Sequence, residues 1–179
     1  MNVLGHGLGY MPLVSLPIQT ERLTIRHYAP GDLRDVADML ADPRVFWWLP
    51  RPLDLEGSRS WLEEQIAAAR RGDGRFAVEC RASGRVIGGA ALTPRDMPWG
   101  REYEVGYHLA VDVWGKGYAT EAARAMVEEA RSRGLRRVVA FISGSNVRSQ
   151  AVAQRLGMAR EAQIDWAGLP HDVWALELD

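Results

Sequence analysis

The chain has 179 residues, of which 47% are apolar and 25% are charged, as in an ordinary globular domain. Its 22 basic and 23 acidic residues nearly cancel, and this balance argues against a nucleic-acid-binding protein, which normally carries a basic surface. The single cysteine, Cys80, excludes an internal disulfide, and no stretch approaches the roughly 18 apolar residues of a membrane span.

Residues 1–17 are apolar and rich in glycine, but they lack the features of a secretory signal peptide. No lysine or arginine precedes Arg22, and glycines interrupt the apolar run. We therefore expect a cytoplasmic protein with no membrane partner and no nucleic-acid partner. The predicted organisation is an N-terminal tail over residues 1–17 and a single domain over residues 18–179.

The first part of the domain predicts a strand, two helices and a hairpin. Alternating apolar and polar residues indicate the first strand, and apolar residues at three- and four-residue spacing indicate the helices. Proline at position 43 disfavours helix in the residue before it, so the first helix ends by Asp42. The expected elements are a strand over 23–27, a helix that includes 33–40, a helix over about 56–71, and strands over 76–81 and 86–92 around a turn at Ser83-Gly84.

The second part of the domain predicts a parallel crossover. A loop over 94–100 precedes a long strand over 102–111, and a glycine-rich turn then opens a helix that continues to about Arg133. The order of the elements indicates an α/β domain with a mixed central sheet of about seven strands and about four flanking helices. The remaining expected elements are a strand over 137–143, a short helix over 149–156, and one or two final strands, the last over 173–178.

The strongest local feature is the junction at residues 113–120, where a strand runs through Gly-x-Gly directly into a helix. Glycines let a backbone approach a ligand closely, and the first turn of a helix leaves its N–H groups unpaired. The helix dipole also favours an anion there. Residues 115–120 can therefore offer several donors to a phosphate, and Lys116, the only lysine of the chain, lies within this turn.

Other interpretations of this junction stay open. The glycines could serve only the geometry of a tight turn. A nucleotide-binding P-loop would require Gly-x-x-x-x-Gly-Lys-Ser/Thr, whereas Tyr118 follows Gly117 here. A dinucleotide-binding fingerprint would require a third glycine at Thr120 and an acid at the end of the next strand, which ends at Ser143. A nucleotide-binding enzyme is therefore the weaker alternative.

Residues 114–122 read Trp-Gly-Lys-Gly-Tyr-Ala-Thr-Glu-Ala and resemble the acetyl-CoA signature of the GNAT superfamily, most of all its branch of ribosomal-protein N-terminal acetyltransferases and their relatives. Gly117 and Ala119 match the last two fixed positions of the superfamily pattern Gln/Arg-x-x-Gly-x-Gly/Ala, and Trp114 replaces the first. The resemblance extends over about residues 18–179. Further segments that are similar in the same order are 20–26, 104–107 and 146–158.

The resemblance implies an acetyl-CoA-dependent N-acetyltransferase of GNAT-like fold, in which a primary amine attacks the acetyl group directly in a ternary complex. The acceptor would be a protein N-terminus or a small amine, and this branch often forms homodimers. It also implies that pantetheine lies along a strand edge, the diphosphate in the glycine turn, and the thioester near the last helix. The implied cofactor-binding residues are Leu109, Ala110, Val111, Gly115, Lys116, Gly117, Tyr118, Ala119, Thr120, Asn146 and Ser149.

The reaction requires a proton acceptor. An alkylamine is mostly protonated at neutral pH, so a base or a water chain must remove a proton before the attack. Glu104 is the first candidate for this catalytic base, with Glu102 and His108 behind it. Two plainer roles stay open: Glu104 could pair with an arginine of a neighbouring strand, and His108 could be a packed core histidine.

The leaving thiolate and the oxyanion need hydrogen-bond donors as well. Many members of the family use a tyrosine of the last helix as the acid, but no tyrosine lies between residues 146 and 158 here. Ser149 is expected to act in its place, by a hydrogen bond to the departing sulfur, although it could also cap its own helix. A backbone N–H near Leu109 or Ala110 would stabilise the oxyanion.

Aromatic residues supply candidates for the acceptor-binding wall. Trp47 and Trp48 follow the first helix, in a segment that often lines the acceptor pocket in this family, but they could equally belong to the core. Trp166 in a late loop, together with Glu104 and His108, completes the candidate set. No His or Cys cluster has metal-ligand spacing, so no metal is expected. Because the tyrosine acid is missing, a catalytically weak acyl-CoA-binding or regulatory domain is the competing function.

Overall fold

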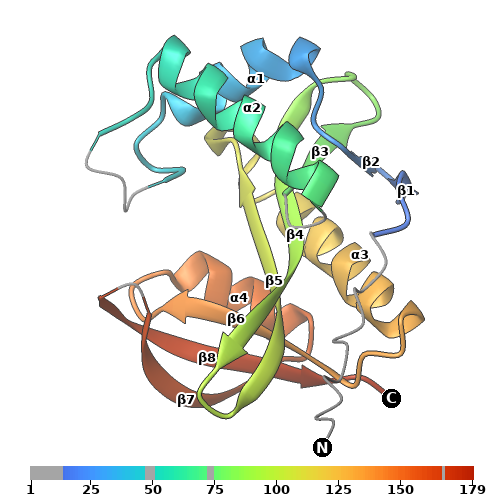
Figure 1. The fold of residues 1–179 in the computed structure, drawn as a ribbon, viewed down its shortest axis with the longest axis vertical. Helices are drawn as coiled ribbons and strands as arrows, with labels where there is room; N and C mark the ends of the chain where they lie inside the picture. Colours follow the sequence, from blue (N-terminus) through green and yellow to red (C-terminus); the bar gives the residue numbers. More distant parts are fainter. Residues whose placement is uncertain (1–13, 47–50, 72–74, 167) are drawn as a thin grey trace, which may run out of the picture.

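A computed structural model describes residues 14–46, 51–71, 75–166 and 168–179, which form an α/β domain (Figure 1). The helices are α1 (Leu33–Leu40), α2 (Leu55–Arg71), α3 (Tyr118–Ser132) and α4 (Val147–Arg155), with 3-10 turns at Pro30–Asp32 and Val111–Val113. The strands are β1 (Ile18–Gln19), β2 (Leu23–Arg26), β3 (Phe76–Cys80), β4 (Val86–Met97), β5 (Gly100–Leu109), β6 (Arg137–Ser143), β7 (Ala159–Trp166) and β8 (Leu169–Glu177).

The strands form one mixed sheet in the order β1-β2-β3-β4-β5-β6-β8-β7. Neighbouring strands are antiparallel except β5 and β6, which run parallel across the crossover that contains α3. The α/β class, the mixed sheet and the four helices are confirmed for the described residues. The sheet has eight strands rather than about seven, because short β1 adds a strand at one edge.

The loop predicted over residues 94–100 is wrong. β4 continues to Met97 and β5 begins at Gly100, and these two residues pair across a tight turn. Pro94 is tolerated within β4 because β3 pairs with this strand only as far as Ala90. Beyond that point one side of β4 is an edge, where a residue without an N–H breaks no ladder bond. The result is a long hairpin through the centre of the domain (Figure 1).

The parallel strands β5 and β6 are paired at one position only, Glu104 with Val139, within the described residues. On its other side β5 stays paired with β4 along its whole length, from Gly100 to Leu109. The second half of β5 therefore has one paired side and one open side, which faces the gap between β5 and β6. This confirms the expected separation of the strand that precedes the glycine turn.

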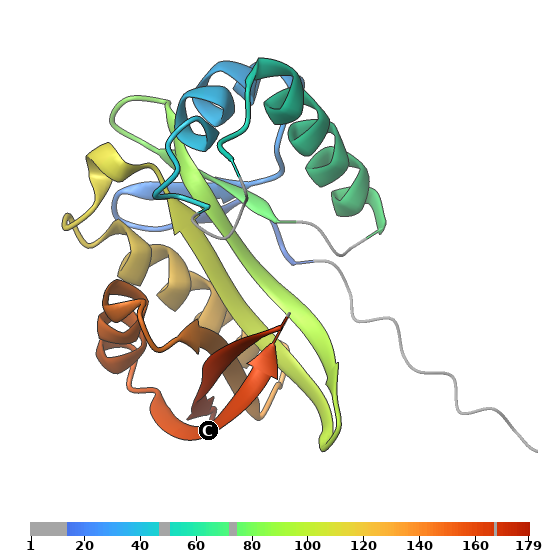
Figure 2. The ribbon, with the colours of Figure 1, turned by 90° about the vertical axis from the view of Figure 1, so that its left-hand side faces the viewer.

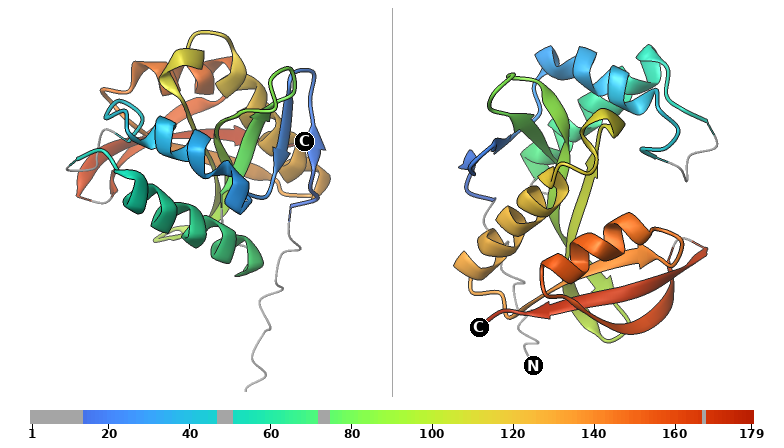
Figure 3. Two further views of the ribbon diagram at one scale, coloured as in Figure 1. Left: turned by 90° about the horizontal axis from the view of Figure 1, so that it is seen from above. Right: turned by 180° about the vertical axis from the view of Figure 1, so that it is seen from behind.

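The two sides of the sheet carry different helices. Figure 2 and the left view of Figure 3 show α1 and α2 on one side and α3 on the other, with α4 beside the lower part of the sheet. Small side chains let α3 pack closely on the sheet. None of the described helices is long and apolar enough to cross a membrane. The buried residues of α3 are Ala122, Ala123, Ala125, Met126, Val127 and Ala130.

The described end of the predicted N-terminal tail packs against the domain. Val14 is buried, and Leu16 packs against the hydrophobic core. The backbone N–H of Ser15 donates a hydrogen bond to Oε1 of Glu129 in α3, at 3.0 Å. These contacts attach residues 14–16 to α3, while the boundary between tail and domain at residue 17 stays a prediction.

Strands β4 and β5 approach most closely at Gly88 and Gly89. A Cβ atom on Gly88 would overlap the carbonyl oxygen of His108, and one on Gly89 would overlap the His108 ring. The hydroxyl of Tyr28 donates a hydrogen bond to the carbonyl oxygen of Gly88 at 3.1 Å, so the same site is closed from a third direction. Glycine is therefore required here to seat the His108 ring against the sheet.

We predict that Gly88→Ala lowers the free energy of unfolding by about 1–3 kcal/mol, because the new methyl group meets backbone that cannot move aside. Gly31→Ala is the matched control: a Cβ there would meet no atom within 4 Å, so the change should stay within about 1 kcal/mol of zero. Urea unfolding followed by circular dichroism measures both. Equal stability of the Gly88→Ala variant and the wild type would contradict this packing argument.

Candidate active site

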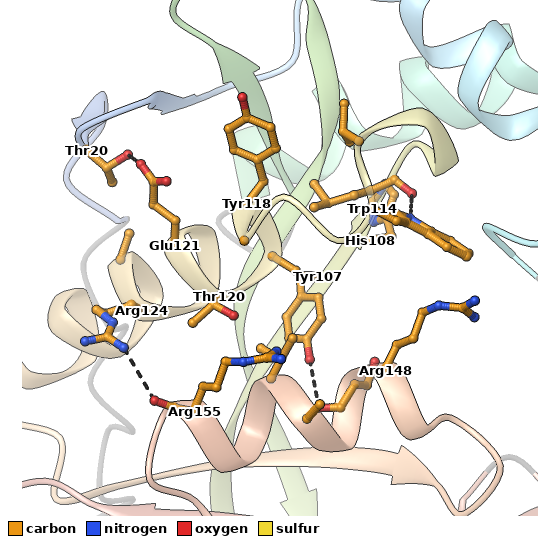
Figure 4. A pocket seen from close by; sticks show the side chains of 18 of the residues that line it. Thr20, Tyr107, His108, Trp114, Tyr118, Thr120, Glu121, Arg124, Arg148 and Arg155 are labelled. Atoms are coloured by element: carbon orange, nitrogen blue, oxygen red, sulfur yellow. Dashed lines mark hydrogen bonds between the residues drawn. The ribbon is translucent and has the colours of Figure 1, made fainter.

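A cleft of about 1480 Å³ opens between the N-terminus of α3, the end of β5 and α4. Figure 4 shows side chains that reach into it from these elements, among them Thr120 of α3, Tyr107 of β5 and Arg148 of α4. The cleft brings together most of the cofactor-binding residues predicted from the sequence. Those that line it are Leu109, Val111, Gly115, Gly117, Tyr118, Ala119, Thr120, Asn146 and Ser149.

The glycine turn presents free donors to this cleft. Gly115 and Gly117 have φ values of 76° and 83°, a conformation that other residues rarely adopt. A Cβ atom on Gly115 would meet no atom within 4 Å, so the space beside the turn is open. No side chain caps the N-terminus of α3, and the N–H of Glu121 makes the first bond back to Gly117, at 3.1 Å. The N–H groups of residues 118–120 are therefore available to an anion.

Arg22, immediately before β2, holds this turn in place. Its Nη1 donates to the carbonyl oxygen of Lys116 at 2.9 Å, and its Nε donates to Oε2 of Glu121 at 2.7 Å. The hydroxyl of Thr20 donates to the other carboxylate oxygen of Glu121 at 2.6 Å (Figure 4). The Arg22 guanidinium also lies 4.5 Å from the centre of the Tyr118 ring. Residues 20–22 of the segment with family resemblance thus position the turn, which the sequence alone did not indicate.

Two of the predicted cofactor-binding residues do not line the cleft. Lys116 lies in the turn, but only its neighbours Gly115 and Gly117 contribute to the cleft wall. Ala110 is buried, and its N–H donates to the carbonyl oxygen of Ile87 at 2.8 Å. That N–H is therefore not free to stabilise an oxyanion. Val111 lines the cleft from a 3-10 turn, because β5 ends at Leu109 rather than at residue 111.

A second cavity of about 150 Å³ adjoins the cleft where β5 and β6 separate. Tyr107, His108, Asn146 and Ser149 line both spaces, so they mark the place where the cleft and the cavity meet. Glu104 lines the smaller cavity. Two ligands can therefore bind side by side and meet at these four residues, as a group transfer between them would require.

The carboxylate of Glu104 is paired, as the plainer interpretation of this residue expected. Nε of Arg95 donates to Oε2 of Glu104 at 2.7 Å, and Nη2 of Arg95 lies 2.7 Å from the same oxygen. Arg95 is on β4, so the pair crosses the long hairpin. Both contacts use Oε2. Among the described residues no hydrogen bond reaches Oε1, which leaves this oxygen for a ligand in the cavity. Glu102, the other predicted carboxylate, is buried and bonded to Trp99 and Arg137.

His108 is buried at the meeting point of the two spaces, and both of its ring nitrogens lack a hydrogen-bond partner among the described residues. Its ring packs against Phe46, with ring centroids 4.9 Å apart, and edge-on to Trp61 at 5.8 Å. Burial, assisted by the positive charge of Arg75, lowers the pKa of His108 well below its usual value. The imidazole is therefore neutral at physiological pH and can accept a hydrogen bond.

Tyr107 is the residue that the sequence analysis missed. Its hydroxyl donates to the carbonyl oxygen of Ser149 at 3.3 Å, so it lies against α4 between the cleft and the cavity (Figure 4). Burial raises the pKa of Tyr107 to about 12, and the hydrogen bond with Ser149 opposes this shift. The absence of a tyrosine from the last helix was a signal to look for one on another element.

The start of α4 differs from the prediction. The helix begins at Val147 rather than at Ser149, and Asn146 is its N-cap, since Oδ1 of Asn146 accepts the N–H of Ser149 at 3.1 Å. Ser149 is therefore not the cap, and it lines both spaces. Capping fixes the side chain of Asn146, so this residue helps the site mainly by orienting the first turn of α4.

The aromatic candidates for the acceptor wall are only partly placed. Trp47 and Trp48 lie outside the described residues, as does the side chain of Trp166. Phe46, the described neighbour of the tryptophans, is buried and lines the smaller cavity. Within the described residues no group of three or more His, Cys, Asp or Glu side chains could hold a metal ion.

The chain was compared with protein families and with known proteins. A family profile described as an acetyltransferase (GNAT) domain matches residues 22–159. An L-methionine sulfoximine/L-methionine sulfone acetyltransferase of Pseudomonas paraeruginosa is 29% identical, over 81% of this chain and 83% of its own length.

Solved structures with the same fold accompany these relatives. An acetyltransferase of Agrobacterium tumefaciens has a TM-score of 0.71 and 28% identity, over 89% of this chain and 92% of its own. The ribosomal alpha-N-protein acetyltransferase RimL, solved in complex with coenzyme A, has a TM-score of 0.73 and 21% identity. The match covers 91% of this chain and 98% of RimL, and it supports the fold alone.

We predict that Glu121→Gln lowers the free energy of unfolding by about 1–2 kcal/mol at neutral pH, because it weakens hydrogen bonds to a charged group. Burial alone would raise the pKa of Glu121, but the bonds from Thr20 and Arg22 outweigh it, and the pKa is lowered. The difference from the wild type should be complete above the ordinary pKa of a glutamate, about 4.5, and should shrink as the pH falls below it.

Unfolding in urea at several pH values measures this difference. Glu128→Gln on the same helix is the matched control, since the carboxylate of Glu128 is 60% exposed in its pair with Arg131. It should change stability by less than about 0.5 kcal/mol. A Glu121→Gln effect that grows toward acidic pH would show that the ion pair is not what stabilises the turn.

Proposed function

Because the chain belongs to the GNAT acetyltransferases, which use acetyl-CoA and acetylate an amine, we propose that its large cleft binds the cofactor and that a small primary amine reaches the acetyl group from the adjoining cavity. The observation that carries this proposal is the junction of the two spaces at Tyr107, His108, Asn146 and Ser149. An acyl transfer in a ternary complex needs such a junction, because both reactants must be bound at once.

The residues of the cleft fit coenzyme A. The open space beside Gly115 and the free N–H groups of residues 118–120 suit a diphosphate. Arg124, Arg148 and Arg155 extend toward the same cleft from α3 and α4 (Figure 4), and guanidinium groups suit further phosphate oxygens. The open side of β5 near Leu109 suits the amide groups of the pantetheine arm.

When bound, acetyl-CoA supplies an acyl carbon that is already activated by its thioester, so the chain needs no nucleophile of its own. An ammonium acceptor and acetyl-CoA give the N-acetylated amine, free coenzyme A and one proton released to solvent. The protein must therefore take a proton from the nitrogen and place a donor near the departing sulfur.

Glu104 is the group that we assign to the acceptor nitrogen. Its Oε2 is held by Arg95, while Oε1 has no hydrogen-bond partner among the described residues and belongs to the cavity wall. The pairing with Arg95 holds the carboxylate in place through Oε2 and leaves Oε1 available. His108 lies in the same wall as a hydrogen-bond acceptor, because its neutral ring has both nitrogens unpartnered in the described part of the chain. Its lowered pKa makes it a weak base.

Tyr107 takes the place of the tyrosine that the last helix lacks. Its hydroxyl remains protonated at neutral pH, since its pKa lies near 12, and it needs only to turn from the Ser149 carbonyl to meet a departing thiolate. Ser149 itself supplies a second hydroxyl at the same junction. This arrangement supports an active enzyme over the alternative, a catalytically weak acyl-CoA-binding domain.

The acceptor is the part of the function that the relatives leave open. One relative is named for a modified amino acid and one structural neighbour for a ribosomal protein, and both kinds of acceptor carry a primary amine. The cavity of about 150 Å³ favours a small molecule over a folded protein with an extended N-terminus. We therefore place the chain with the small-amine enzymes rather than with the ribosomal-protein branch.

A thiol-release assay tests this function directly. The protein is mixed with acetyl-CoA and a panel of small amines, and the release of free coenzyme A is followed with a thiol reagent while mass spectrometry detects the acetylated product. Amine-dependent release with a product 42 Da heavier (roughly the mass of an added acetyl less one hydrogen) supports the enzyme. Binding of acetyl-CoA without transfer to any amine or peptide would instead support the acyl-CoA-binding domain.

We predict that Glu104→Gln lowers kcat by about 100-fold, the usual contribution of a positioned base, and leaves the Kd for acetyl-CoA unchanged. The amide keeps the shape of the side chain but cannot accept the proton. Glu64→Gln in α2, whose carboxylate is 61% exposed, is the control and should keep full activity. An unchanged rate removes Glu104 from this role, and an equal loss in Arg95→Gln would assign the effect to the ion pair instead.

We predict that Tyr107→Phe lowers kcat by about 10- to 100-fold with little change in the KM for acetyl-CoA, because only the hydroxyl that serves the leaving thiolate is lost. Tyr103→Phe is the matched control, since Tyr103 is on the same strand two pleats away and outside both spaces. A Tyr107→Phe variant with full kcat would leave Ser149 as the remaining donor.

A further inference from the structure

Arg75, immediately before β3, places a guanidinium in the wall of the smaller cavity. Its Nη1 lies 3.5 Å from the position that a Cβ would take on Gly106, so the group lies over β5 between Glu104 and His108. An arginine with no role beyond the protein surface would not need this position over β5.

No hydrogen bond or ion pair is formed by this guanidinium within the described residues; the backbone N–H of Arg75 alone is bonded, to Gln65 at 3.3 Å. Burial lowers the pKa of Arg75, and the nearby charge of Glu104 only partly opposes the shift. Arg75 is half-buried, and a partly desolvated charge without a partner is unfavourable to a fold. The guanidinium is therefore better explained by an anion that binds in the cavity than by a structural role.

The neighbouring carboxylate does not neutralise Arg75. Oε2 of Glu104 accepts its contacts from Arg95. The charge of Glu104 acts to raise the pKa of Arg75, but no direct ion pair joins these two side chains in the described residues. Two arginines and one glutamate leave this wall with a net charge of one positive unit. The cavity wall thus holds a guanidinium from the residue before β3 and a carboxylate from β5, on either side of the space for a ligand.

A zwitterion is the ligand that matches this pair of charges. A carboxylate suits the planar fork of a guanidinium, and an ammonium suits a carboxylate oxygen. An α-amino acid carries both groups on one carbon, so it can meet Arg75 and Glu104 together. Apolar side chains line the cavity beside its polar ones and suit an uncharged side chain of the ligand; they are Phe46, Ala140, Phe141 and Ile142.

From this geometry we infer that the acceptor is a free α-amino acid with an apolar side chain, held through its carboxylate by Arg75 and with its amine directed to Glu104. The inference rests on the proposed function, whose acceptor class it specifies. It also separates amino acids from protein N-termini, because a peptide has an amide where the free acid has its carboxylate. A peptide or an amine without a carboxylate would leave Arg75 unpaired.

The test compares acceptors that differ in the carboxylate alone. L-Leucine, L-methionine and L-phenylalanine are each assayed beside the corresponding amide and the decarboxylated amine, by coenzyme A release and product mass. For the wild type we expect kcat/KM for the free acids to exceed that for the amides by about 10- to 100-fold, the value of a charge-assisted bidentate contact. Equal rates for acids and amides would overturn the inference and leave the acetyltransferase proposal intact.

Three variants assign the preference to a residue. Arg75→Gln should remove the preference for the acids while activity on the amides persists, and Arg75→Lys should keep part of it, because a point charge replaces the fork. Arg101→Gln is the control, since Arg101 pairs with Asp96 at the exposed end of the hairpin. Equal loss on acids and amides in Arg75→Gln would contradict the assignment.

Two further measurements separate a substrate contact from a structural one and binding from catalysis. Arg75→Gln should unfold at the same or a higher temperature than the wild type, because an unpaired, half-buried charge is removed; a clear loss of stability would indicate a structural arginine. Calorimetric titration of the coenzyme A complex with L-leucine and L-leucinamide measures binding without turnover. Carboxylate-dependent binding without transfer would retain the inference and overturn the proposed function, whereas neither binding nor transfer would overturn both.

Discussion

The single parallel pairing between β5 and β6, at Glu104 and Val139, is the constraint on which the site depends. Beyond it β5 keeps its ladder with β4 but loses its neighbour on the other side. Backbone groups that leave a sheet must find other partners, because an unpaired buried N–H or C=O is costly. The gap therefore creates both the demand for a ligand and the space for one, and the residues of β5 that follow Glu104 are those that line it.

Local chemistry explains why part of this site could be predicted from the sequence. The conformation of the turn at Gly115 and Gly117 is set by two glycines at the start of a helix, so it could be predicted from nine residues. Helix α3 and the strand over 137–143 were also predicted correctly. A helix buried on one side and a strand buried on both sides each leave a recognisable pattern of apolar residues.

The parts that escaped prediction depend on pairings across the chain. The partner of Glu104 is Arg95, and this contact could not be expected while residues 94–100 were taken for a loop. Tyr107 was not among the predicted site residues, because alternation gives the face of a strand and not the loss of its neighbour. Arg75 lies beside Gly106 of β5, a contact between residues 31 positions apart that no local pattern encodes.

Arg22 shows how far the cleft depends on distant sequence. It lies 94 residues before Lys116, yet its guanidinium bonds the backbone of the turn and the first carboxylate of α3. Under the proposed function, diphosphate binding at the turn and the folding of the strand at Leu23–Arg26 are therefore coupled. If this strand leaves the sheet, the affinity of the turn for a diphosphate falls as well. By reciprocity, a bound cofactor should slow the exchange of amide hydrogens in that N-terminal strand, although it touches none of them.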